Sequence, residues 1–208
     1  MGNISGLPVA YFMQTMADFK SEARKGLRAP TMIALAKELS DDENKALAEY
    51  YAAQKATPWI KVIESTTAPK TFIGGNNTRR LWPLGGEEPV GERVIEYAID
   101  FPTMRAANSQ GFVAYVPPGS VAEGQALVTT GGGKAIACGT CHGGTLTGLG
   151  NVPPIAGRSP VYLARQLYMY KNGDRGGPNA EIMKGIVANL QDHDIVAIVA
   201  YLASRPPS

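Results

Sequence analysis

The chain has 208 residues, a length that suits one or two domains. Its 20 basic and 18 acidic side chains nearly balance, and no run of lysine and arginine is interleaved with aromatic residues, which excludes the usual signature of a nucleic-acid-binding protein. The apolar run over residues 195–203 is too short to cross a bilayer, so the sequence predicts no transmembrane segment.

The first segment, residues 1–56, contains neither cysteine nor histidine. Ser40 and Glu43 have the spacing of a capping box, which predicts a helix that begins directly after Ser40. A segment of about fifty residues is too small to bury a sufficient core alone.

The second segment, residues 57–120, is a connector rich in glycine and proline. Turn signals occur at residues 74–77 and 83–86. The stretches 93–99 and 111–116 are short and rich in β-branched and aromatic residues, so they are predicted to pair as strands. We expect an irregular connector with a short β-hairpin and no catalytic group.

Two tryptophans of this connector, Trp59 and Trp82, are expected to pack it onto the neighbouring domains, with partner docking as the less favoured alternative. The charged side chains of its second half are interpreted as a solvated face; they are Glu87, Glu88, Glu92 and Arg93.

The third segment, residues 121–208, carries clear helical signals. A short helix is predicted over residues 121–130, and Ser159-Pro160 supplies an N-cap and a first-turn proline for the next one. A last helix starts near Asp192 and presents a single apolar face, formed by Ile195, Ile198, Val199 and Leu202.

The motif Cys138-Gly139-Thr140-Cys141-His142 uses both cysteines of the chain and one of its two histidines. The pattern C-x-x-C-H is typical of covalent attachment of c-type haem. Two thiols three positions apart lie on one side of a helical turn, where both can add to the vinyl groups of a haem. His142 follows immediately and is predicted to be the proximal ligand of the iron.

Other interpretations of this motif are weaker. A structural zinc site needs four ligands, and no other cysteine is present. A thioredoxin-like redox pair is expected in a βαβ context, whereas the surroundings here are rich in glycine and then helical. A disulfide across so short a loop would be strained and would leave His142 unexplained.

A second axial ligand is sought among Met169, Met183 and His193. His193 falls in the polar first turn of the last helix, which indicates a solvated residue. Met169 lies at helical spacing among apolar residues, where methionine is commonly core filler. Met183 is favoured because His/Met is a standard ligand pair for electron-transfer haems.

With these motifs, residues 121–206 resemble a class I cytochrome c domain. The resemblance implies a mostly α-helical fold and a covalently bound haem c. It also implies that Pro153-Pro154-Ile155 is the haem-pocket loop, in which a proline carbonyl accepts a hydrogen bond from His142. Pro153 is favoured for this role, and Pro154 is the alternative.

An internal repeat relates the first segment to the third at a constant offset of 151 residues. Met32 is the counterpart of Met183. The arrangement resembles the diheme cytochromes c of the c-four type, in which two class I domains are fused. Nine identical pairs share this register: Gly6/Gly157, Tyr11/Tyr162, Lys20/Lys171, Arg24/Arg175, Gly26/Gly177, Met32/Met183, Leu39/Leu190, Asp41/Asp192 and Tyr50/Tyr201.

The first copy departs from that family because no C-x-x-C-H motif precedes Met32. Residues 1–56 are therefore expected to be the distal half of a cytochrome c-like domain with an incomplete haem site. Two explanations compete: the chain is part of a longer diheme protein, or the first domain has degenerated. The first is favoured because the segment retains apolar residues that would line a haem pocket, namely Phe12, Met13, Met16 and Met32. One haem is expected for this chain and two for a full-length diheme form.

The resemblance implies a carrier of single electrons in a bacterial respiratory or periplasmic redox chain. Its partners would be a redox protein donor and acceptor that dock transiently. A periplasmic location is expected although residues 1–6 show no signal peptide. The alternatives are a haem enzyme with peroxidase-like activity and a haem-binding subunit of a larger oxidoreductase complex.

Overall fold

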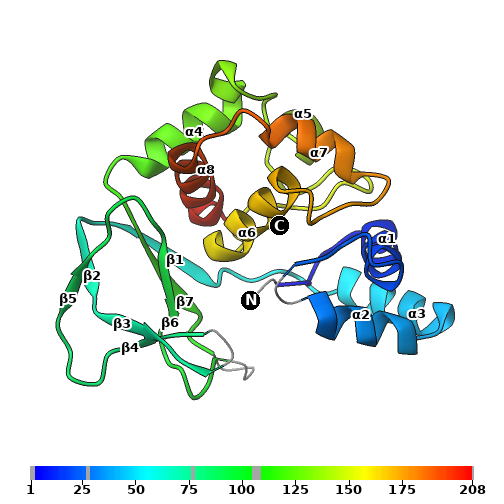
Figure 1. Ribbon diagram of the computed structural model, residues 1–208, viewed down its shortest axis with the longest axis horizontal. Helices are drawn as coiled ribbons and strands as arrows, with labels where there is room; N and C mark the ends of the chain where they lie inside the picture. Colours follow the sequence, from blue (N-terminus) through cyan, green and yellow to red (C-terminus); the bar gives the residue numbers. More distant parts are fainter. Residues whose placement is uncertain (1–2, 27–28, 76–77, 105–108, 208) are drawn as a thin grey trace.

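A computed structural model describes residues 3–26, 29–75, 78–104 and 109–207. Three regions lie side by side in Figure 1: three N-terminal helices, a group of short strands, and a C-terminal helical region. The helices are α1 Val9–Lys20, α2 Ala29–Glu38, α3 Asp41–Ala52, α4 Ser120–Thr130, α5 Gly139–His142, α6 Pro160–Lys171, α7 Ala180–Val187 and α8 Asp192–Ser204, with a 3₁₀ turn at Gly131–Gly133. The strands are β1 Ile60–Glu64, β2 Thr67–Pro69, β3 Thr71–Ile73, β4 Arg79–Leu81, β5 Glu87–Pro89, β6 Ile95–Ala98 and β7 Phe112–Val116.

The predicted helix starts are confirmed by their capping bonds. At the start of α3, the Ser40 side chain accepts a hydrogen bond from the Glu43 amide, and the Glu43 side chain accepts one from the Ser40 amide. The Ser159 side chain accepts from the Tyr162 amide at the start of α6. The last helix begins at Asp192 as predicted. Met183 precedes this last helix, and it lies in a separate short helix, α7, that the sequence does not predict.

The C-terminal core forms where α4 packs against α8. Gly124 permits this contact, because a Cβ atom at this position would lie 1.9 Å from the Ala197 carbonyl oxygen. Almost every residue of α8 from Asp194 to Ala203 is buried. Side chains of α4, α6 and α7 complete this core, among them Leu127, Val128, Leu163 and Val187. Cys138 of the C-x-x-C-H motif packs against this core.

The connector has more β structure than predicted. The expected hairpin is present as β6 and β7, which pair antiparallel. Strand β1 adds to β7 in parallel to give the order β1-β7-β6, and β2 with β5 and β3 with β4 form two further antiparallel ladders. The parallel pairing joins residues about fifty positions apart, so no local turn signal announces it.

The expected packing of both tryptophans onto the neighbouring domains is wrong for Trp82. Its ring stands edge-on to Phe72 of the same connector, 5.8 Å between centroids, and the residue is 39% exposed. The Trp59 ring packs on Phe112, also a connector residue, with 5.8 Å between centroids, and Trp59 borders a small cavity together with the C-terminal residues Gly157 and Ala203. The Trp59 carbonyl accepts from the Phe112 amide at 2.8 Å. Both rings therefore stabilise the connector itself.

The predicted solvated face is correct for Glu87, Glu92 and Arg93, which are exposed, and wrong for Glu88. The Glu88 side chain is only 18% exposed and accepts from the Thr71 amide at 2.9 Å and from Arg93 at 2.9 Å. Hydrogen bonds from Thr71 and the charge of Arg93 lower the pKa of Glu88. This carboxylate links the two small ladders.

The N-terminal and C-terminal helices follow one plan. Helices α1, α2 and α3 begin at residues 9, 29 and 41, and α6, α7 and α8 begin 151 residues later at 160, 180 and 192. A backbone hydrogen bond that links the residues before the first helix to the end of the third is repeated as well. The Gly6 amide donates to the Tyr51 carbonyl and the Gly157 amide donates to the Leu202 carbonyl, each at 2.9 Å. The offset found in the sequence is thus also an offset between helices.

The two helical regions meet through a short antiparallel bridge between Arg24 and Arg175. The Lys25 amide donates to the Asp174 carbonyl at 2.6 Å, and the Gly176 amide donates to the Ala23 carbonyl at 2.8 Å. Positions 23 and 25 correspond to 174 and 176 in the repeat, so this pair of bonds is symmetric about the junction.

Candidate haem centre

The two thiols lie on one helical turn. Cys138 is the N-cap of α5, and the His142 amide donates to the Cys138 carbonyl at 3.0 Å. Both cysteines are half-buried and free. Burial, together with the neighbouring Cys141, raises the pKa of Cys138 to about 11. A reactive redox pair needs a lowered thiol pKa, and the burial of Cys138 acts in the opposite direction.

His142 is held by the predicted hydrogen bond to Pro153. Its Nδ1 atom lies 2.8 Å from the Pro153 carbonyl oxygen. A carbonyl can only accept, so Nδ1 carries the proton and Nε2 keeps its lone pair. Burial lowers the pKa of His142, against the opposing effect of the Pro153 bond. A neutral imidazole with a fixed tautomer suits ligation of a metal through Nε2.

Backbone hydrogen bonds fix the loop that carries Pro153. The Gly148 amide donates to the His142 carbonyl at 2.9 Å, and the Ile155 amide donates to the Leu146 carbonyl at 2.9 Å. Pro154, the alternative acceptor, is buried in this loop, and Ile155 packs against the C-terminal core. The loop thus fixes the carbonyl that orients the histidine.

Met183 is half-buried on α7 and packs against the same core as Cys138 and Ile155. Three of the predicted site residues are therefore gathered around one core. Met169 is half-buried, but it faces the other region: a Cβ atom at Gly26 would lie 3.0 Å from its Cε atom. It is a junction residue rather than filler of the C-terminal core.

Three exposed apolar side chains near these residues were not anticipated. Ile136, Leu149 and Ile182 are 59%, 61% and 64% exposed, and Ile182 directly precedes Met183. The fit to a haem rests on the two free thiols of one helical turn and on the oriented imidazole beside them. In the sequence, Ile136 lies two residues before Cys138 and Ile182 directly precedes Met183, so their apolar character beside predicted site residues could have drawn attention to them.

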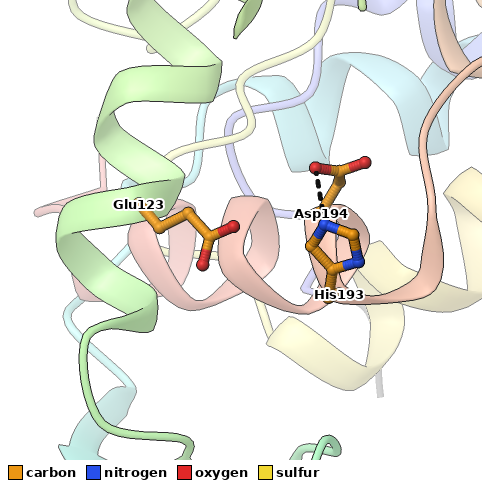
Figure 2. A group of neighbouring side chains, drawn as sticks. All are labelled: Glu123, His193 and Asp194. Atoms are coloured by element: carbon orange, nitrogen blue, oxygen red, sulfur yellow. Dashed lines mark ion pairs between the residues drawn. The ribbon is translucent and has the colours of Figure 1, made fainter.

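A second polar cluster joins α4 to the start of α8, and Figure 2 shows its three side chains, Glu123, His193 and Asp194. His193 is exposed, as predicted, and its Nε2 atom lies 3.4 Å from Asp194. The buried Asp194 carboxylate already accepts from the Lys134 ammonium at 2.7 and 2.9 Å and from the Gln191 amide at 2.7 Å. Both oxygens of Asp194 therefore already accept hydrogen bonds that hold the start of α8. We interpret the three side chains as a structural cluster.

Met32, the counterpart of Met183, lies half-buried on α2 and packs with Met16 and Phe19. Neither a cysteine nor a histidine precedes it in the sequence. The N-terminal region therefore repeats the helical frame of the C-terminal site without its thiols or imidazole.

Among the described residues, no single helix is long and apolar enough to cross a membrane; α7 and α8 meet those criteria only as a pair, with a bend of 116° between them.

Comparison with known proteins places this site in a family. The family model described as Cytochrome c matches residues 121–206. The thiosulfate dehydrogenase electron acceptor of Stutzerimonas stutzeri is 37% identical over 89 residues, which cover 41% of this chain and 40% of that protein. The chain thus matches less than half the length of that relative.

Two further comparisons bear on the fold and the family. The crystal structure of reduced recombinant cytochrome c4 from Pseudomonas stutzeri aligns with a TM-score of 0.63 at 20% identity, covering 98% of this chain and 84% of that one, and supports the fold. Cytochrome c-554(548) of Halomonas halodenitrificans is 38% identical over 69 residues, which cover 33% of this chain and 83% of that protein. The chain belongs to the cytochrome c family, whose members carry covalently bound haem c.

Proposed function

We propose that the chain is a carrier of single electrons. Cys138 and Cys141 would hold haem c through thioether bonds, and His142 and Met183 would bind the iron. The observation that carries this proposal is the 2.8 Å contact from His142 Nδ1 to the Pro153 carbonyl, directly after the C-x-x-C turn. It supports a neutral histidine whose Nε2 atom is oriented for a metal.

The haem supplies a one-electron change of oxidation state when bound. The chain supplies the ligands and the surroundings. Met183 offers a neutral thioether, which favours ferrous over ferric iron. The apolar core beside Cys138, Ile155 and Met183 acts in the same direction, because it disfavours the additional charge of the ferric state. If His142 and Met183 both bound the iron, the chain would leave no open ligand position for a substrate.

The peroxidase-like alternative needs a distal base. The only histidine besides His142 is His193, which is exposed on the first turn of α8 and faces Asp194. No observation favours this alternative, so the electron carrier is the better account.

The partners are proposed to be a redox donor and a redox acceptor that dock transiently, in the periplasm. A relative whose name is thiosulfate dehydrogenase electron acceptor is a precedent for such a partnership. Electron-transfer contacts are small and weak, and the exposed apolar side chains Ile136, Leu149 and Ile182 are candidates for such a contact.

Residues 1–56 are proposed to be the distal half of a cytochrome c-like domain, residues 57–120 a connector, and residues 121–208 the haem domain. The shared helix starts and the repeated Gly6 and Gly157 hydrogen bonds support this division. Met32 would then be the remnant ligand position of an incomplete site, and this chain would hold one haem.

Acid-acetone extraction tests the attachment. The account expects the haem to stay with the polypeptide and a pyridine haemochrome assay to give one haem per chain. The variant Cys138→Ala/Cys141→Ala should release all of its haem. Free extraction from the unmodified protein would contradict covalent attachment.

A further inference from the structure

Leu146 has a backbone conformation that is unusual for its residue type. Its φ is +64°, and Glu22 is the only other non-glycine residue with a positive φ in the described parts of the chain. This left-handed region favours glycine and is strained for a bulky side chain. The Leu146 side chain is 5% exposed and belongs to the C-terminal core. Burial of the leucine therefore holds a backbone conformation that the residue would not adopt alone.

The backbone of Leu146 joins the haem motif to the chain that follows Pro153. Its amide donates to the carbonyl of Gly143, the residue directly after His142, at 2.8 Å. Its carbonyl accepts from the Ile155 amide at 2.9 Å and from the Ala156 amide at 3.1 Å. One residue thus connects the two sides of the loop.

The two prolines of this loop depend on such outside support. Pro153 and Pro154 have no backbone N–H, so neither can donate a hydrogen bond that would fix its own position. Val152, just before them, donates to the Leu149 carbonyl at 2.9 Å, inside the same loop. The first two amides after the prolines both donate to Leu146. The position of the Pro153 carbonyl therefore follows from the backbone of Leu146.

We propose that Leu146 is a positioning residue for the iron ligand His142. Its left-handed backbone holds the Pro153 carbonyl 2.8 Å from His142 Nδ1, and this contact sets how strongly His142 donates to the iron. A hydrogen-bond acceptor behind a ligating histidine raises its donor strength, and a stronger donor favours ferric iron and lowers the reduction potential. The inference rests on the proposed function, because it needs His142 as the ligand.

Leu146→Ala and Leu146→Gly separate the backbone of this residue from its side chain. Both variants remove the buried leucine, but only glycine adopts a positive φ without strain. Leu146→Ala should therefore displace the Pro153 carbonyl more than Leu146→Gly, although it removes less volume. Loss of core volume alone predicts the opposite order.

Two measurements on the haem-loaded protein report the position of this carbonyl. The reduction potential should be highest in Leu146→Ala, lower in Leu146→Gly and lowest in the parent. In the ferrous protein, hydrogen exchange of the His142 Nδ1 proton, followed by NMR, should be about tenfold faster or more in Leu146→Ala than in the parent. Leu127→Ala is the matched control, because Leu127 is a buried leucine of the same core that lies on α4. It should lower the free energy of unfolding without raising the potential.

Unchanged potential and exchange in a folded Leu146→Ala overturn the proposal, and so does a larger effect of Leu146→Gly. If neither variant folds, the unmodified protein decides. Its His142 Nδ1 proton and its Ile155 amide should have protection factors within about threefold of each other, because both bonds open with the same loop. Protection of the His142 proton that is lower by about tenfold or more overturns the proposal. Each of these results, obtained with the haem retained in acid acetone, leaves the proposed function standing; free extraction of the haem would contradict both.

Discussion

Helices α1–α3 and α6–α8 share their starting positions and their closing hydrogen bonds, yet they differ in how deeply they are buried. In α8, nine residues are buried, whereas in α3 only Asn44 and Ala48 are. Helix α4 packs across α8 at Gly124 and covers it, which completes the C-terminal core.

The chemistry follows the same division. The C-terminal region adds two thiols and an oriented imidazole to its helices, whereas residues 1–56 contain neither cysteine nor histidine. Repetition of a fold thus leaves the function of each copy to the segments around it.

Gly124→Ala tests the origin of this difference most strongly. The new methyl group would meet the Ala197 carbonyl, so α4 and α8 must separate. We expect a loss of about 3 kcal/mol in the free energy of unfolding, measured by urea denaturation. Gly185→Ala in α7 is the matched control, because no atom lies within 4 Å of its added Cβ. Equal effects of the two substitutions would contradict the role of close helix packing.

Lys134→Met tests the capping of α8. Removal of the ammonium leaves the buried Asp194 carboxylate with fewer partners, at a cost of about 2 kcal/mol. Burial raises the pKa of Asp194, but Lys134, the Gln191 amide and His193 outweigh it and lower the pKa. The stabilisation is therefore complete above the unfolded pKa of about 3.9 and is lost as pH falls through the lower folded value.

Acid denaturation monitored by circular dichroism measures this effect. The Lys134→Met variant should unfold at a higher pH than the parent. An unchanged acid midpoint would show that Lys134 does not stabilise the ionised Asp194.

Ser159→Ala should have the smallest effect on stability, about 1 kcal/mol. It removes the N-cap of α6 and the hydroxyl that bonds Glu96. The equivalent position before α1 is Pro8, which makes no side-chain cap. Pro8→Ala should therefore change the thermal midpoint less than Ser159→Ala does, and the reverse order would contradict the capping argument.

The sequence predicted the parts of the structure that local patterns encode. The starts of α6 and α8 rest on short local spacings, and the structure contains both. The Pro153 contact was implied by the resemblance to class I cytochrome c domains, and the structure contains it as well. Helix α7 was missed because its eight residues are stabilised by packing against α6. The parallel pairing of β1 with β7 joins residues far apart in the chain, which no local pattern reports.

The central claim is that the C-terminal copy alone ligates haem iron through its repeated methionine. The most direct test compares Met183→Ala with Met32→Ala in the ferric optical spectrum. The account predicts that Met183→Ala abolishes the sulfur-to-iron charge-transfer band, because the thioether ligand is lost, while Met32→Ala leaves the band unchanged. Persistence of the band in Met183→Ala would contradict the claim and direct attention to Met169.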